Sequence, residues 1–316
     1  GMWADSFTVW AYPGPRSGAC SNPWPRILML RCGAVRAGCS PQSSRLWGVS
    51  GFGDNGRFNG GGTMAWEPER YLQFSDERLR PAVDLLGRVT LASPARIVDL
   101  GCGAGNVTRL LQARWPDAEL RGVDNSPEML ARARQALPSA QFELAAVEDW
   151  QPDAPVDLVF SNAALHWVGE HHHLFPRLMG AVAQGGVLAV QMPGNFAAPS
   201  HRLICELAES DAWRERVGRG RMGAILEMDA YFRVLSPWAQ TVTVWETTYW
   251  QALSGAAPVL DWLRGTTLVP YLAPMSDLER EAFLAQLGAR LAVAYPKDEQ
   301  GRTLFPFRRV FLVAQR

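Results

Sequence analysis

The sequence has no apolar run approaching the roughly 18 residues that a membrane span requires. It also carries no net charge, because 31 basic residues balance 31 acidic ones. Nothing in this balance indicates a nucleic-acid partner or an anionic membrane surface. The five cysteines show no CxxC spacing, which argues against a metal knot and indicates a reducing compartment, the cytoplasm. The 47% hydrophobic content suits a soluble globular enzyme of one or two domains.

The first 63 residues contain few acidic residues, with none between Asp5 and Asp54. This stretch is rich in Gly, Ser, Pro and Trp, has no amphipathic period, and begins with Gly1, which we interpret as an expression scar. One interpretation is a targeting extension. The other, which we favour, is upstream DNA translated from a start codon set too early, with Met64 as the natural start. We expect residues 1–63 to be disordered or non-native, although their tryptophans leave an ordered extension open.

The most informative segment is 97–105, which reads Ile-Val-Asp-Leu-Gly-Cys-Gly-Ala-Gly. A short apolar strand ends in a glycine loop, and a segment with helical periodicity follows. Glycine is needed where φ is positive or where a ligand approaches the backbone closely. Asn106 stands where a dinucleotide fingerprint would have glycine or alanine, and Asp99 would repel a pyrophosphate but can bind the ammonium of a methionine tail. The segment, with Gly101, Gly103 and Gly105, resembles motif I of class I S-adenosylmethionine methyltransferases.

Strands and helices alternate after this extension. The patterns predict strands over 95–100, 119–123, 140–144, 156–161 and 186–192, and helices over 105–114, 127–136 and 172–182. A further helix over 69–86 is interrupted at Pro81. The alternation predicts the α/β class with a Rossmann-like parallel sheet, whose ligands bind at the carboxyl ends of the strands.

The later part of the chain departs from this alternation. Strands over 240–250 and 303–314 close the predicted sheet, and the segments 199–235 and 256–295 are helical. We therefore expect a methyltransferase domain over 64–316. Its core comprises 64–196, 237–254 and 300–316, and a helical cover inserted in the C-terminal half comprises 197–236 and 255–299.

Asp124 ends the second predicted strand, nineteen residues after the last glycine of the loop, where a carboxylate can accept both ribose hydroxyls. Many relatives have an aspartate after the third strand that binds the adenine amino group, but Ala146 stands there in this chain. Backbone groups near Val147, or the side chain of Glu148, are the expected substitutes. The remaining residues expected on the cofactor side are Asn106 next to the glycine loop, Asn125 and Met129 beside the adenine, Asn162 after the fourth strand, and Tyr71 and Arg78 over the methionine carboxylate.

The turn after the fourth predicted strand, 161–167, is expected to face the sulfonium and the substrate. His166 in this turn is a candidate substrate contact, and a direct role in proton transfer is a weaker alternative. The consecutive residues His171, His172 and His173 suggest a metal site, but successive helical residues point in different directions. We interpret them as a solvated helix start and expect no metal site.

Several segments outside the cofactor motifs resemble the trans-aconitate 2-methyltransferase family. They are Trp66, Tyr71–Phe74, Glu77–Arg78, Arg80–Ala82, Trp150–Pro152, Gln191–Pro193 with Asn195, Thr247–Tyr249, Asp261–Trp262 and Phe311–Ala314. The resemblance implies methyl transfer from S-adenosyl-L-methionine to a carboxylate of trans-aconitate or a similar polycarboxylic acid, giving a monomethyl ester. Such a carboxylate is already a nucleophile at neutral pH, so no general base is required.

A polycarboxylate substrate requires cations and hydrogen-bond donors, and arginine binds carboxylates through two parallel hydrogen bonds. The expected substrate-binding residues are His166, Trp167, Asn195, Tyr249 and Arg309, with Arg308, Arg219 and Arg221 as further candidates. Three other functions stay open. They are methylation of a malonyl group on a carrier protein, for which no basic docking cluster is evident, a nicotinamide-dependent oxidoreductase, and a cofactor-binding module without catalysis.

Overall fold

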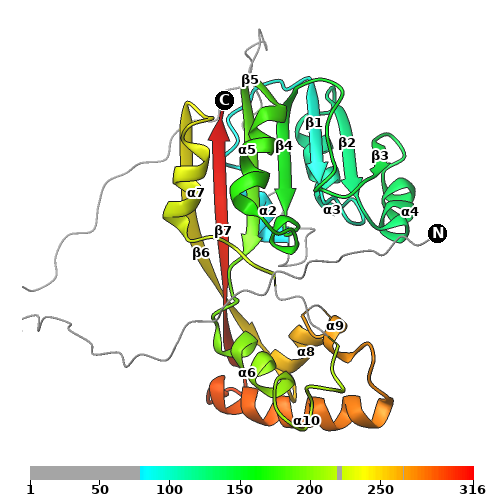
Figure 1. Ribbon diagram of the computed structural model, residues 1–316, viewed down its shortest axis with the longest axis vertical. Helices are drawn as coiled ribbons and strands as arrows, with labels where there is room; N and C mark the ends of the chain where they lie inside the picture. Colours follow the sequence, from blue (N-terminus) through cyan, green and yellow to red (C-terminus); the bar gives the residue numbers. More distant parts are fainter. Residues whose placement is uncertain (1–78, 219–222, 266) are drawn as a thin grey trace, which may run out of the picture. The chain divides into compact units, whose positions relative to one another are not determined.

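The computed structural model describes residues 79–218, 223–265 and 267–316 (Figure 1). The predictions made for residues 1–63, Tyr71, Arg78, Arg219 and Arg221 lie outside these ranges.

The described chain contains one sheet of seven strands in the order β3-β2-β1-β4-β5-β7-β6. The strands are β1 (Arg96–Leu100), β2 (Glu119–Asp124), β3 (Gln141–Leu144), β4 (Val156–Asn162), β5 (Val182–Pro193), β6 (Thr241–Leu253) and β7 (Thr303–Gln315). The first five run parallel, and β7 lies antiparallel between β5 and β6. The predicted strands are confirmed, with β5 beginning four residues earlier than expected.

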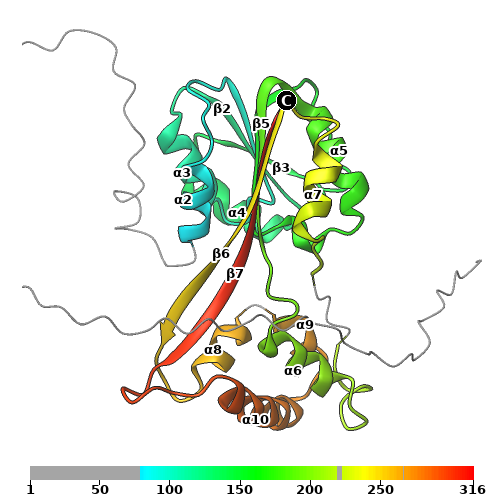
Figure 2. The same ribbon diagram turned by 90° about the vertical axis from the view of Figure 1, so that its left-hand side faces the viewer.

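Helices cover both faces of the sheet (Figure 2). One face packs against α2 (Arg80–Leu86) and α3 (Asn106–Arg114), and the other against α5 (His171–Ala181) and α7 (Met228–Leu235). Helix α4 (Pro127–Ala136) contacts β2 and β3. Pro81 lies in the first turn of α2, where its missing N–H leaves no helical bond unmade. No helix in the described ranges combines the length and apolarity needed to cross a membrane.

Four helices form a second layer with its own apolar core, around Phe283, Leu287 and Phe305. These helices, here called the cover, are α6 (Pro199–Ala208), α8 (Pro258–Arg264), α9 (Val269–Leu272) and α10 (Asp277–Ala294). Strand β7 pairs with β5 only over residues 309–315, whereas it pairs with β6 over its whole length. The far ends of β6 and β7 therefore leave the sheet and extend to the cover (Figure 2).

The expected cover segment 197–236 divides between two places. Helix α6 belongs to the cover, but α7 packs on the sheet beside α5. The buried side chains of Tyr231 and Leu235 in α7 belong to the apolar core between that face of the sheet and its helices. The sequence predicted helical structure over 199–235, but nothing local to α7 specified which apolar surface it would meet.

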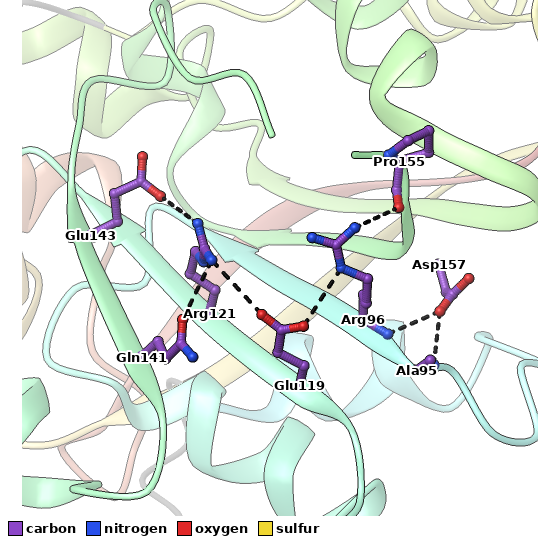
Figure 3. Close-up of polar contacts among 8 residues, drawn as sticks. All are labelled: Ala95, Arg96, Glu119, Arg121, Gln141, Glu143, Pro155 and Asp157. Atoms are coloured by element: carbon purple, nitrogen blue, oxygen red, sulfur yellow. Dashed lines mark hydrogen bonds and ion pairs between the residues drawn. The ribbon is translucent and has the colours of Figure 1, made fainter. Parts of the chain in front are cut away.

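Polar contacts join the amino ends of the strands (Figure 3). Oδ2 of Asp157 accepts hydrogen bonds from the backbone N–H groups of Ala95 at 2.7 Å and Arg96 at 2.9 Å. Glu119 pairs with Arg96 at 3.6 Å and with Arg121 at 3.8 Å. Exposed ion pairs of this kind contribute little stability individually. Together with the backbone bonds they fix how β1, β2 and β4 begin, and hence where their carboxyl ends meet.

Candidate functional site

The loop after β1 adopts a backbone that only glycine takes readily. The φ angles are +78° at Gly101, +54° at Gly103 and +80° at Gly105. A Cβ added at Gly101 would lie 2.2 Å from Cβ of Ala164, in the turn after β4, so the two loops touch. A Cβ added at Gly103 would meet nothing within 4 Å. The loop is therefore packed against the turn after β4 at Gly101 and faces open space at Gly103, as a ligand cradle requires.

Asp124 is held at the end of β2 by backbone donors. Its Oδ2 accepts the N–H of Gly103 at 2.8 Å, and its Oδ1 accepts the N–H of Ser126 at 2.9 Å. Each carboxylate oxygen keeps a further lone pair. The half-buried carboxylate is thus fixed beside the glycine loop and can still accept two hydroxyl groups.

Asp99 lies beneath the loop with 1% of its surface exposed. Its Oδ2 accepts a hydrogen bond from the hydroxyl of Thr108 at 2.6 Å. Burial raises the pKa of Asp99 to about 7; the charge of Asp124 adds to this effect, and the hydrogen bonds from Thr108 oppose it. A cation brought to this carboxyl would favour its ionised form.

The residues expected around an adenine ring lie at an open edge of the site. Asn106, Asn125, Met129 and Glu148 are exposed, and Val147 is half-buried. The carbonyl of Val147 accepts a hydrogen bond from Arg177 at 2.6 Å, and Arg177 also binds the carbonyl of Trp150 at 2.5 Å. Arg177, which the sequence did not single out, therefore fixes the turn that replaces the expected aspartate.

The turn after β4 brings further polar groups to the loop. Asn162 ends β4, and its Oδ1 is buried without a hydrogen-bond partner in the described structure. Ala163 has a φ of +56°, an unfavourable value for a residue with a Cβ, and its N–H donates to the carbonyl of Gln191 at 2.9 Å. Backbone strain of this kind costs of order 1–3 kcal/mol and concentrates at functional sites.

His166 lies in the short helix η2 (Leu165–Trp167) and is 5% exposed. Its Nδ1 is buried with no partner among the residues described, and its ring lies 4.5 Å from that of Trp167, which is 45% exposed. The N–H of Ala224 donates to its carbonyl at 3.0 Å. Burial lowers the pKa of His166 to about 3, helped by the charges of Arg309 and His171. The imidazole is therefore uncharged at neutral pH.

Arg309 lies in the middle of β7, where it pairs with Pro193 of β5 and Thr247 of β6. Its Nε is buried without a hydrogen-bond partner, and no carboxylate in the described ranges forms an ion pair with it. The guanidinium lies 4.4 Å from the ring centre of Phe307. Burial lowers the pKa of Arg309 to about 10, which Tyr249 opposes. A cation so enclosed and uncompensated is suited to bind an anion.

Arg308 differs from its neighbour because it pairs with Glu246 at 2.6 Å. Both polar atoms of the Asn195 amide form hydrogen bonds with the backbone of Arg308. Its Oδ1 accepts from the N–H of Arg308 at 2.7 Å, and its Nδ2 donates to the carbonyl of Arg308 at 3.2 Å. The hydroxyl of Tyr249 donates to Asp84 at 2.5 Å. Asn195 and Tyr249, expected as substrate contacts, therefore already have protein partners that hold the strands around Arg309.

His171 corrects the prediction of a solvated histidine run. It is 5% exposed; its Nδ1 lies 2.6 Å from the hydroxyl of Tyr231, and its Nε2 lies 2.9 Å from the carbonyl of Leu165. His172 and His173 are exposed, as expected. In the part of the chain that the structure describes, no three His, Cys, Asp or Glu side chains gather as a metal ion would require.

Gln191 is a polar residue of the site that the sequence reasoning did not assign. It is completely buried in β5, and neither atom of its amide has a partner in the described structure. The available signal was a glutamine directly after the apolar run 187–190 of the strand.

Comparisons with known proteins agree with this geometry. A family model described as "Methyltransferase domain" matches residues 97–186. A trans-aconitate 2-methyltransferase from Methylobacterium nodulans is 48% identical over 256 residues, which cover 79% of this chain and 98% of that protein. The one from Acidovorax ebreus is 46% identical over 253 residues, with 79% and 98% covered.

Among solved structures, the YcgJ protein of Bacillus subtilis superposes with a TM-score of 0.50 at 14% identity, covering 74% of this chain and 96% of that one. This likeness concerns the fold alone, which is the Rossmann-like class I methyltransferase fold that the sequence predicted. The identity to curated relatives over nearly their whole length shows more than the fold. The chain belongs to the trans-aconitate 2-methyltransferase family.

Proposed function

We propose that the protein transfers a methyl group from S-adenosyl-L-methionine to one carboxylate of trans-aconitate, giving a monomethyl ester. The names of its relatives specify methyl transfer to trans-aconitate. The observation that carries it to this chain is Arg309, a half-buried residue whose Nε is buried without a hydrogen-bond partner and which has no carboxylate partner in the described structure. Its charge adds to the effect of burial in lowering the pKa of His166. His166 follows Ala164, which lies against the glycine loop at Gly101. An anionic substrate bound by Arg309 would therefore lie close to the cofactor cradle.

The residues around the glycine loop fit S-adenosyl-L-methionine. The open side of Gly103 leaves room for it, Asp124 can accept the ribose hydroxyls, and Asp99 can bind the ammonium group. When bound, this cofactor supplies an electrophilic methyl group on a sulfonium. We assign the adenine to the open edge formed by Asn106, Asn125, Met129, Val147 and Glu148, and the neighbourhood of the sulfonium to Asn162.

The protein's own residues need only align the two reactants and exclude water. The accepting carboxylate is ionised at neutral pH and needs no general base. His166, whose pKa burial lowers to about 3, would act by hydrogen bonding through Nδ1 rather than by proton transfer. Trp167 would shield the reacting atoms, while Tyr249 and Asn195 hold the strands that carry Arg309. The free thiols Cys102 and Cys205 agree with the reducing cytoplasm, which we propose as the compartment.

The direct test is methyl transfer by the purified full-length chain with labelled S-adenosyl-L-methionine. Trans-aconitate, citrate, a trans-aconitate triester and a malonyl-carrier protein serve as alternative acceptors. We expect trans-aconitate to be the preferred acceptor, with a monomethyl ester identified by mass spectrometry. Preference for the carrier protein, or binding of NADH without binding of S-adenosylhomocysteine, would contradict the proposal.

Replacing Asp124 with asparagine should weaken binding of S-adenosylhomocysteine by about tenfold to a hundredfold. The change keeps the shape but removes the charge and one acceptor, and an unpaired buried polar group costs about 1–3 kcal/mol. Isothermal titration calorimetry gives the affinity. Asp157→Asn is the matched control, because Asp157 also accepts two backbone N–H groups but lies at the opposite ends of the strands. Equal affinities for Asp124→Asn and the wild type would remove Asp124 from the cofactor site.

Binding of S-adenosylhomocysteine should strengthen as pH rises from about 6 to 7.5. The ammonium prefers the ionised form of Asp99, whose pKa burial raises to about 7 in the free protein. The same shift makes Asp99 destabilise the free fold increasingly as pH rises from its unfolded pKa of about 3.9 towards 7, because the native state holds the proton longer. Calorimetry across this range should give a rising profile for the wild type and a flat one for Asp99→Asn. A wild-type profile as flat as the variant's would exclude this role.

We also propose that residues 64–316 form the complete methyltransferase domain. The relative that is 48% identical has 98% of its length covered by 79% of this chain, and the composition changes at Met64. Deleting residues 1–63 should leave the melting temperature and kcat/KM largely unchanged. An insoluble or inactive 64–316 protein would show that the domain needs the earlier residues.

A further inference from the structure

The side-chain amide of Gln191 forms no hydrogen bond in the described structure. The residue is completely buried, and both Oε1 and Nε2 lack a hydrogen-bond partner among the described residues. Its backbone is fully engaged, since its carbonyl accepts the N–H of Ala163 at 2.9 Å and β5 pairs here on both sides. An unpaired buried polar group costs about 1–3 kcal/mol, and native proteins contain few of them. The side chain is therefore retained at a cost to stability.

The strand register places Gln191 between two other unpartnered groups. Gln191 pairs with Asn162 of β4 and with Phe311 of β7, and directly paired residues point to the same face of a sheet. Arg309, two residues from Phe311, shares that face and lies diagonal to Gln191, at roughly 7–8 Å between Cα atoms. Asn162 Oδ1, both amide atoms of Gln191 and Arg309 Nε are all buried and unpartnered. We call Asn162, Gln191 and Arg309 the polar row.

The polar row begins beside the cofactor loop and ends at the enclosed cation. Asn162 begins the turn whose Ala164 lies against Gly101. In the same turn, burial lowers the pKa of His166, and the charge of Arg309 adds to this effect. A polycarboxylate that presents one carboxylate for methylation has other carboxylates a few ångströms away. Arg309 can bind one of them, and Gln191 Nε2 is a donor suited to another.

We propose that Gln191 is a substrate-binding residue, which donates from Nε2 to a substrate carboxylate and accepts from Arg309 Nε–H through Oε1. The amide of Gln191 would then orient the guanidinium of Arg309. It would also select substrates that carry a further carboxylate for Nε2 to bind. The proposal rests on the proposed function, whose substrate it narrows to acids with at least two carboxylates besides the methylated one. Because Gln191 is fully enclosed, the contact requires neighbouring side chains to move when substrate binds.

The test is Gln191→Met, which keeps the approximate length of the side chain and removes both hydrogen-bonding atoms. No bond is lost in the free protein, so its melting temperature should be unchanged or higher. Binding of S-adenosylhomocysteine should be unchanged, while KM for trans-aconitate should rise at least tenfold with a smaller change in kcat. Gln191→Asn, which keeps the amide on a shorter side chain, should have a smaller effect on KM than Gln191→Met.

Gln251→Met is the matched control. Gln251 Oε1 is also buried and has no partner among the described residues, and Gln251 lies on the same face of β6 as Thr247. It lies four residues beyond Thr247, the partner of Arg309, a separation of about 13 Å along the strand. Its replacement should leave KM unchanged.

A lower melting temperature for Gln191→Met with an unchanged KM would show a structural amide and overturn the proposal. Equal changes in KM for the two methionine variants would overturn it as well. A wild-type protein that does not methylate trans-aconitate would instead refute the proposed function itself, and with it the assignment of Gln191.

Discussion

Replacing Arg309 with alanine should lower kcat/KM for trans-aconitate by about tenfold to a hundredfold. This range corresponds to a charge-assisted contact of about 1.5–3 kcal/mol. Arg309→Lys should fall between this variant and the wild type, because lysine keeps the charge but loses the planar fork that binds a carboxylate through two hydrogen bonds. Steady-state kinetics with trans-aconitate as the varied substrate measure both effects. The affinity for S-adenosylhomocysteine should not change.

Arg308→Ala is the natural comparison, because Arg308 is adjacent in the same strand. Its guanidinium is paired with Glu246 at 2.6 Å, whereas Arg309 has no carboxylate partner in the ranges described. We expect Arg308→Ala to keep kcat/KM within about threefold of the wild type, the loss of an exposed ion pair being small. If Arg309→Ala methylates trans-aconitate at the wild-type rate, the substrate site lies elsewhere.

Replacing Gly101 with alanine should weaken cofactor binding more than tenfold and destabilise the fold. The residue has a φ of +78°, which costs a residue with a Cβ about 1–3 kcal/mol. The added Cβ would also lie 2.2 Å from Cβ of Ala164, so the loop and the turn after β4 must separate. We expect the affinity for S-adenosylhomocysteine to fall more than tenfold and the free energy of unfolding to fall by at least about 2 kcal/mol. Calorimetry and chemical denaturation measure these changes.

Two variants separate backbone strain from steric overlap at this glycine. Gly301 has a similar φ of +74°, and a Cβ added there would meet nothing within 4 Å. Gly301→Ala should therefore lower the free energy of unfolding through backbone strain alone and leave cofactor binding unchanged. Adding Ala164→Gly to Gly101→Ala removes the overlapping methyl group and should restore part of the affinity, as a double-mutant cycle would reveal. Wild-type affinity in Gly101→Ala alone would mean that this loop does not contact the cofactor.

The sequence alone predicted the secondary structure well because each element has a local cause. Gly101, Gly103 and Gly105 were assigned to a ligand loop from their spacing, and all three have positive φ. The helix predicted over 127–136 is α4, and its start has a local cause, because the Ser126 side chain accepts the N–H of Met129. Steric limits on φ and the capping of a helix depend on a few neighbouring residues, so a single sequence contains them.

The state of the individual site residues was decided by contacts between distant parts of the chain. Asn195 and Tyr249 were expected to contact the substrate, yet their partners are Arg308 and Asp84, which lie 113 and 165 residues away in the sequence. Likewise, no local pattern distinguishes Arg309 from Arg308, although only Arg308 of the two forms an ion pair, with Glu246, in the described structure.

The sequence by itself determined the class of the fold, the family and the position of the glycine loop. Only the tertiary structure decided that α7 packs on the sheet, that His171 is buried, and that the amide of Gln191 and the Nε of Arg309 are buried without hydrogen-bond partners in the described ranges. The physical reason is that burial and pairing depend on which strands lie side by side. The register of β7 between β5 and β6 brings Arg309 near Gln191 and Tyr249, and that register follows from the packing of the whole sheet.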